Sequence, residues 1–256
     1  MTQLDLSTLS LCYHSRQPND YESDSENGTG EEGYLDEESE RQNRVKTVLW
    51  YEIVDASGNE VGRINAWIFR TKEFQDEGGW LMFMDEESQE THEFSCLFTD
   101  RALLKPQFSR EGTGVWGAEV TERPFIAYIE GIRVEPEYRG QGIGRWALER
   151  LLDVKDPYFG TVDFIFAWPT PHPKDAPKRD DPNREQIWDS QTARAVKTFQ
   201  RAGYRRLGTT AFFCLARDPN HPSRRIALEQ DAQYSTDVGL SDEEFVKMLG
   251  LDALPR

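Results

Sequence analysis

The sequence predicts an α/β fold, with a mixed central sheet flanked by helices, over residues 44–218. Three observations predict it. Runs of apolar and β-branched residues of strand length come first. A strand, a glycine-rich turn and a helical pattern follow at residues 124–154. A further strand, helix and strand complete the segment, and strands followed by alternating strands and helices are typical of a mixed sheet.

Residues 1–43 precede this domain and are predicted to form a disordered acidic tail. Residues 20–40 contain ten Asp or Glu and no Lys or Arg, in a chain of 256 residues with a formal net charge of −16. Such a segment buries little and repels itself. We interpret it as a solvated tail, with a docking tail or a phosphosite cluster as the alternative.

The first ordered elements are predicted between residues 45 and 98. Residues 45–70 read as two strands, because Val, Ile, Trp and Tyr favour strands and Ser57-Gly58-Asn59 is typical of a turn. Residues 80–98 suggest more strand, with "WLMFM" and "EFSCLF" around an acidic turn. The pattern of residues 100–122 supports no assignment.

The second half of the domain alternates strand and helix. Residues 124–134 are predicted as a strand. A helix is predicted to follow up to Val154, with Ile143, Ala147, Leu151 and Val154 on one face, and Pro157 stops it. The remaining elements are a strand at 161–168, a helix that starts at Asp189 or Ser190 and stops at Gly203, and a final strand or hairpin at 204–216.

Residues 219–256 are predicted to be a C-terminal extension with a short helix. Ser241 is typical of a helix cap, and Phe245, Met248 and Leu249 form an apolar stripe. Docking of this helix on the domain, fraying, and partner binding all remain open.

Composition excludes several classes of protein. The acidic balance argues against a nucleic-acid partner, which would require a basic face. No apolar run approaches the roughly 20 residues of a membrane span. The three cysteines form no CxxC pair, and the first residues lack a secretory signal. We therefore expect a cytoplasmic or nuclear protein without a membrane or nucleic-acid partner.

The stretch "VEPEYRGQGIG", residues 134–144, places three glycines where a strand becomes a helix. Backbone N–H groups at a helix N-terminus lack intrahelical partners and carry partial positive charge. Glycine lets a phosphate approach that backbone. The turn from Arg139 to Gly144 therefore predicts an anion site that needs no basic side chain.

In context this turn resembles motif A of the GCN5-related N-acetyltransferase (GNAT) superfamily, and about 95 residues, 122–216, are similar to it. The resemblance implies a GNAT N-acetyltransferase domain at 44–218 and acetyl-CoA as co-substrate, without a metal. It implies that backbone at Ile132 and Val134 holds the pantetheine arm and polarises the thioester. The pyrophosphate would be held by backbone N–H groups of the turn, namely Arg139, Gly140, Gln141, Gly142, Ile143 and Gly144.

The candidates for the catalytic base are Glu130 and Tyr128, which lie on the same strand. Both have the parity of Ile132 and Val134, unless Gly131 marks a bulge that resets it. The Glu-Gly strand is similar to that of members that acetylate small amines, which favours Glu130. The alternative is a surface carboxylate with no role in the reaction.

Two positions depart from the family pattern. Phe199 stands where a Tyr usually protonates the thiolate, and Thr192 stands where an Asn is frequent. Five other residues have less specific interpretations. His172 is a base candidate or a solvated loop residue. His92 and Cys96 are four residues apart without a second pair, which argues against a metal site. Cys214 is expected in the core, and Trp168 is expected either to pack or to line the acceptor cleft.

The sequence thus predicts an acyl-CoA-dependent N-acetyltransferase whose acceptor is a small-molecule or protein amine. The alternative is a GNAT-fold module that binds coenzyme A for regulation with little or no turnover, which Phe199 favours. A protein that acts mainly through its acidic tail is the weakest interpretation of the domain. The oligomeric state and the acyl chain length stay open.

Overall fold

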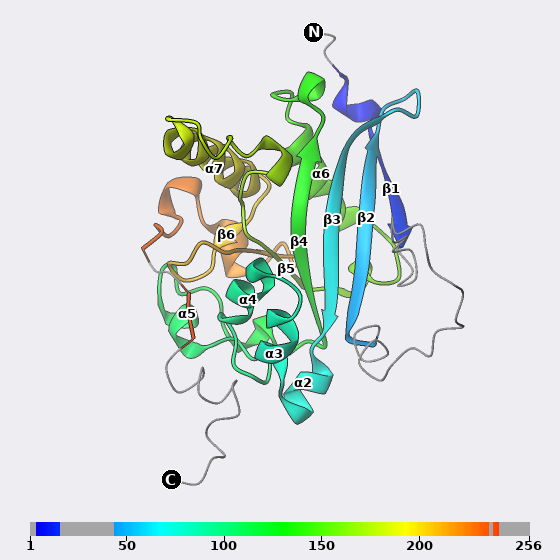
Figure 1. Ribbon diagram of the computed structural model, residues 1–256. Coiled ribbons are helices and arrows are strands. Elements are labelled where there is room, and N and C mark those ends of the chain that lie inside the picture. Colours follow the sequence, from blue (N-terminus) through cyan, green and yellow to red (C-terminus); the bar gives the residue numbers. More distant parts are fainter. Residues whose placement is uncertain (1–3, 16–43, 236–237, 241–256) are drawn as a thin grey trace, which may run out of the picture.

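The structure is a computed structural model that describes residues 4–15, 44–235 and 238–240 of the chain. Its strands are β1 (Ser10–Ser15), β2 (Lys46–Val54), β3 (Glu60–Arg70), β4 (Phe125–Val134), β5 (Phe164–Ala167), β6 (Arg205–Arg206) and β7 (Phe213–Ala216). They form one sheet in the order β1-β2-β3-β4-β5-β7-β6 (Figure 1). β4 and β5 are parallel, and all other neighbours are antiparallel. The predicted mixed α/β fold is confirmed.

Helices cover both faces of this sheet. They are α2 (Lys72–Glu77), α3 (Trp80–Asp85), α4 (Gln89–Ser95), α5 (Pro106–Arg110), α6 (Ile143–Arg150) and α7 (Arg184–Arg201). The first four follow β3 and pack on the face seen at the front of Figure 1, whereas α6 and α7 pack on the opposite face. No helix in the described part of the chain has the length and apolar character of a membrane span.

Each face of the sheet has its own hydrophobic core. On β2, Leu49, Tyr51 and Ile53 are fully buried while their neighbours are half-buried, as expected for side chains that alternate between faces. On the other face, Trp80 and Phe94 pack among further aromatic rings. Burying one such side chain stabilises the fold by about 1.5–3 kcal/mol, so the two cores fix both helical layers against the sheet.

The prediction of strand over residues 80–98 is wrong, because these residues form α3 and α4. The buried residues Trp80, Phe83 and Met84 lie at i, i+3 and i+4, which is a helical spacing. Ser88 is the N-cap of α4, and its hydroxyl accepts the N–H of Thr91 at 3.2 Å. Both signals are in the sequence, but the aromatic composition of the segment favours strand.

The boundary of the predicted tail at residue 43 also requires correction. β1 pairs with β2 from Ser10 opposite Val54 to Ser15 opposite Leu49, so the segment before residue 16 belongs to the sheet. Leu9 is buried in the core below it. Residues 16–43, which carry the acidic run, and the helix expected near Phe245 lie outside the described residues.

The other predicted elements are present, but three of them have shifted ends. The strand predicted at 161–168 covers only Phe164–Ala167, and the helix predicted to run to Val154 ends at Arg150. The strands of residues 45–70 and 124–134, the helix that starts at Ile143 and the hairpin of β6 and β7 are confirmed. The helix predicted from Asp189 or Ser190 begins at Arg184, directly after the Pro-Asn turn at 182–183. It ends as expected, since Gly203 has a φ of +99°.

Candidate active site

The central feature of the site is the separation of β4 from β5. Their parallel pairing is confined to residues 127–129 and 165–167. From Glu130 onward, β4 keeps β3 as its partner but has no strand partner on its β5 side within the described sheet. The predicted cofactor residues Ile132 and Val134 lie on this open stretch, where a ligand can bind to the free strand edge.

A β-bulge at Glu130 sets which way β4 presents its side chains. Ala66 pairs with Ile129 and Asn65 pairs with Gly131, so Glu130 is the extra residue. Before the bulge, Tyr128 faces α4; after it, Ile132 packs on the α6 side. The predicted reset of parity is therefore found, and the catalytic candidates face away from Ile132 and Val134.

The glycine turn lies at the C-terminal end of β4 and leads into α6. Gly140 and Gly142 have φ values of +76° and +86°, a left-handed conformation that favours glycine. A Cβ on Gly140 would meet no atom within 4 Å, so its surroundings are open. Gly144 differs from these two: a Cβ there would make ordinary contacts with Thr198 at 3.5 Å and Ile132 at 3.8 Å, so this position lies packed between α7 and β4.

The side chains of the turn tie it to neighbouring segments. Arg139 donates to the carbonyl of Val134 at 2.8 Å and to Asp175 at 3.0 Å, which links the end of β4 to the loop after β5. Gln141 accepts the backbone N–H of Leu4 at 2.8 Å. Ile143 is buried in the core as the first residue of α6. The turn is thus held from three sides, with its glycine backbone left uncovered by these contacts.

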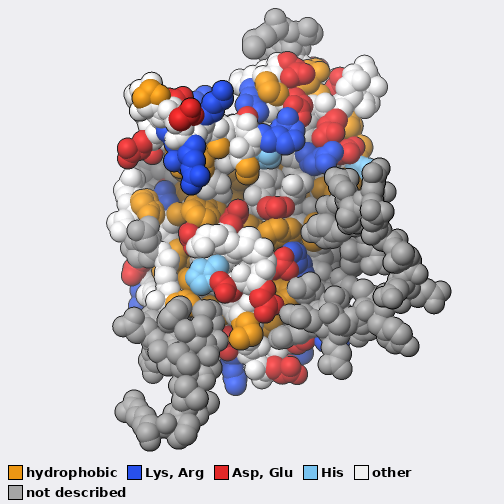
Figure 2. Space-filling view, viewed as in Figure 1, with side chains coloured by type: hydrophobic (Ala, Val, Ile, Leu, Met, Phe, Trp, Pro, Cys, Tyr) orange, Lys and Arg blue, Asp and Glu red, His pale blue; other side chains and the backbone are white. Residues whose placement is uncertain are grey.

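Three carboxylates gather around Tyr128, on the face of the sheet opposite to α6. The Tyr128 hydroxyl, at the end of a fully buried side chain, donates a short hydrogen bond to Glu90 of α4. Glu93 and Glu130 lie near enough for their charges to act on Tyr128. Within the described residues, none of the three carboxylates forms an ion pair. In Figure 2, acidic side chains lie around the hollow at the centre of this face, below a group of basic ones.

This arrangement shifts the ionisation of two carboxylates. Burial raises the pKa of Glu90 to about 7, with further raising by the charges of Glu130 and Glu93 and lowering by the Tyr128 hydrogen bond. Burial also raises the pKa of Glu130, against the attraction of Lys46. A carboxylate with a pKa near neutrality is suited to accept and release protons at physiological pH.

Glu90 and Glu93 were missed by the sequence analysis, because their segment was predicted as strand. The helical spacing around Trp80 and the cap at Ser88 were the signals that would have placed them on a helix. Even then, their proximity to Tyr128 depends on how the α2–α5 segment folds back on the sheet.

Other candidates lie apart from this group. His172 accepts the N–H of Lys174 at 3.2 Å and lines a separate pocket of about 350 Å³, together with Arg63 and Arg133. Burial lowers its pKa. His92 and Cys96 are one turn apart on α4, and His92 faces Asp85 at 2.7 Å. Cys214 is fully buried, as expected.

Phe199 is a core residue. Only 5% of its surface is exposed, and its ring packs edge-on against Tyr204 at 5.1 Å. On the same helix, the Thr192 hydroxyl and the Gln191 carbonyl oxygen are buried and have no hydrogen-bond partner among the described residues. α7 therefore carries two buried side-chain oxygens without hydrogen-bond partners among the described residues, but at position 199 it has no side chain that could donate a proton.

Comparison with protein families identifies the domain. Residues 66–171 match the model of the acetyltransferase (GNAT) family. The match covers less than half of the chain, but it contains all of β4, the glycine turn, α6 and the three carboxylates. This part of the chain is thus similar to the GNAT family, as the glycine turn predicted, and that family uses acetyl-CoA. A search of curated proteins gives no match.

The raised pKa of Glu90 predicts a pH-dependent stability. Since its pKa is about 7 in the folded protein and about 4.3 when unfolded, its contribution to stability is full below pH 4.3 and is lost as the pH rises through 7. Glu90→Gln should therefore stabilise the protein at pH 8.5, relative to its effect at pH 5, by about 2 kcal/mol.

Urea unfolding of both proteins at the two pH values measures this difference. Glu86→Gln, at an exposed position just before α4, is the matched control and should show no such pH-dependent gain. An equal effect of Glu90→Gln at both pH values would contradict the pKa of Glu90.

Proposed function

We propose that this protein is an acyl-CoA-dependent N-acetyltransferase that transfers an acetyl group from acetyl-CoA to an amine by direct attack. The open edge of β4 carries this proposal. It lies between the glycine turn on one side and the carboxylates around Tyr128 on the other. A thioester bound along that edge would present its carbonyl to an amine held near Glu130.

The residues present are suited to coenzyme A. The uncovered backbone at Gly140 and the N-terminus of α6 would hold the pyrophosphate. The strand edge at Ile132 and Val134 would bond the pantetheine arm. The unpartnered oxygens of Gln191 and Thr192 add two groups that a polar ligand beside α7 would satisfy. Acetyl-CoA supplies the activated acyl group.

The carboxylates would handle the protons. The amine forms its bond to the acyl carbon while the bond to sulfur breaks, and the ammonium proton passes to Glu130, directly or through water. The thiolate takes its proton from water, since Phe199 has none to give. Glu90, coupled to Glu130 by charge, would set the pH at which the pair is ionised.

The alternative is a GNAT-fold module that binds coenzyme A for regulation and does not turn over. The burial of Phe199 against Tyr204 favours it, because no acid stands at that position. Calorimetry of acetyl-CoA binding, followed by thiol release with a panel of amines, separates the two. Binding with thiol release supports the enzyme, whereas binding without release on any amine supports the module.

Gly142→Val should abolish coenzyme A binding while the fold persists. The φ of +86° strains any residue with a Cβ, so the substitution would distort the turn whose backbone N–H groups are proposed to hold the pyrophosphate. We expect the Kd for coenzyme A, measured by calorimetry, to rise at least tenfold.

Gly58→Val provides a control with the same kind of strain. Gly58 has a φ of +82° and open surroundings in the turn between β2 and β3, which is separate from the glycine turn. It should lose similar stability but keep its affinity for coenzyme A. Unchanged affinity in Gly142→Val would refute the assignment of the pyrophosphate site.

Glu130→Gln should lower kcat about 100-fold, the usual contribution of a general base, with little change in the Kd for acetyl-CoA. The substitution keeps the size of the side chain but removes its ability to accept a proton. Steady-state thiol release between pH 6 and pH 9 measures it, with exposed Glu122→Gln as the control. Wild-type turnover across that range would exclude Glu130 as the base.

Tyr128→Phe should shift the pH dependence of kcat/KM to higher pH. Wild-type activity should rise through about pH 7 as Glu90 ionises. The Tyr128 hydrogen bond lowers the pKa of Glu90, so its removal raises that pKa and delays the rise. The ring and its packing on Trp67 at 5.9 Å are retained. An unshifted profile would mean that Glu90 does not control the reaction.

A further inference from the structure

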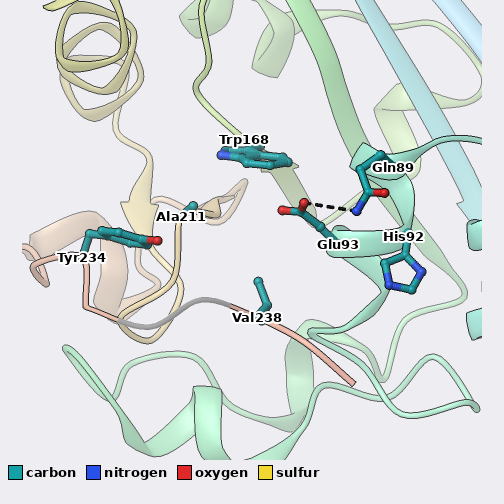
Figure 3. A pocket seen from close by; sticks show the side chains of 7 residues that line it. All are labelled: Gln89, His92, Glu93, Trp168, Ala211, Tyr234 and Val238. Carbon is teal, nitrogen blue, oxygen red and sulfur yellow. Dashed lines mark hydrogen bonds between the residues drawn. The ribbon is translucent and has the colours of Figure 1, made fainter. Parts of the chain in front are cut away.

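We infer that the acceptor is a small aliphatic diamine, whose second ammonium group binds in the pocket between α4 and the end of β5. This inference rests on the proposed acetyltransfer and names its substrate class. The pocket, of about 250 Å³, is lined by Gln89, His92, Glu93, Trp168, Ala211, Tyr234 and Val238 (Figure 3).

The pocket combines one carboxylate with aromatic and aliphatic walls. In Figure 3, the Glu93 carboxylate points toward the Trp168 ring, and Ala211 and Val238 lie on the far side of the space. Trp168 is fixed by its packing on Phe212 at 5.3 Å. A carboxylate beside a tryptophan face is suited to an alkylammonium group, which gains both a charge-assisted hydrogen bond and a cation–π contact.

Neighbouring cationic side chains do not neutralise the charge of the Glu93 carboxylate. Lys46 is paired with Glu87, and His92 lies against Asp85. Glu93 accepts a hydrogen bond from the Gln89 amide at 3.3 Å, and it has no ion pair among the described residues. A cationic ligand would supply the missing partner.

The pocket lies next to the proposed reaction centre. Glu90 and Glu93 are three residues apart on α4 and therefore lie on one face of it, with Cβ atoms about 5–6 Å apart. Glu93 acts by charge on both Glu90 and Tyr128. One amine of a short diamine can then be placed near Glu90 and Glu130 while the other remains charged beside Glu93.

The pocket that His172 lines, beside Gly131, has a mixed lining. Three basic residues, Arg63, Arg133 and Lys174, line it together with Glu60 and Glu135. Arg63 pairs with Glu60 at 3.2 Å, and Arg133 pairs with Glu135 at 2.9 Å. The acidic residues of that pocket are thus already paired with basic ones, whereas Glu93 is not.

The test compares 1,4-diaminobutane with 1-aminobutane, which lacks only the second amine. With the full chain, thiol release should give a kcat/KM at least tenfold higher for the diamine. Glu93→Gln should lower this diamine-to-monoamine ratio about tenfold, the loss expected for one charged hydrogen bond. Trp168→Leu should lower it as well, and Glu86→Gln, outside the pocket, should leave it unchanged.

Calorimetry of 1,4-diaminobutane on the protein saturated with coenzyme A gives a readout without turnover, and Glu93→Gln should weaken that Kd about tenfold. A wild-type diamine-to-monoamine ratio of kcat/KM near one would overturn the inference, and so would a ratio that Glu93→Gln leaves unchanged. Either result would leave the proposed acetyltransferase activity intact. A preference for Lys-containing peptides over the diamine would overturn it too. If no amine releases thiol, the proposed function fails. The calorimetric Kd for 1,4-diaminobutane, with and without Glu93→Gln, then still shows whether the pocket binds a diamine.

Discussion

The loss of pairing between β4 and β5 after Ile129 is the constraint on which the site depends. A continuous parallel ladder would satisfy the backbone of β4 on both edges and leave nothing for a ligand. The sheet instead continues on the β3 side alone. The open edge therefore keeps the stability of a paired strand while exposing hydrogen-bonding groups at the place where the strand ends in the glycine turn.

The bulge at Glu130 divides this strand into two functional halves. Without the extra residue, Tyr128 and Ile132 would face the same side of the sheet. With it, the part of β4 before the bulge directs Tyr128 into the aromatic core under α4, and the part after the bulge packs Ile132 on the α6 side. Glu130 itself lies at the junction. One strand thus serves both the proposed cofactor side and the proposed acceptor side.

The helices inserted between β3 and β4 give the acceptor side its charge. Burial of Glu90 against Tyr128 costs stability once the carboxylate is ionised, and that cost appears as its pKa of about 7. The surrounding aromatic core, with Phe94 tilted on Tyr128 at 4.5 Å, stabilises the fold enough to hold this group in place. A destabilising carboxylate in a well-packed region is typical of functional sites.

The sequence by itself determined the local features: the strands around the Ser-Gly-Asn turn, the glycine turn with its helix and the missing acid at Phe199. It offered a bulge at Gly131 as one alternative, and the structure places the extra residue at Glu130. Each depends on residues close in the chain, whose conformational limits can be read directly. Only the tertiary structure decided that Glu90 and Glu93 stand beside Tyr128, and that β1 joins the sheet. Those contacts join segments about 40 residues apart, and their geometry comes from packing of whole layers rather than from any local preference.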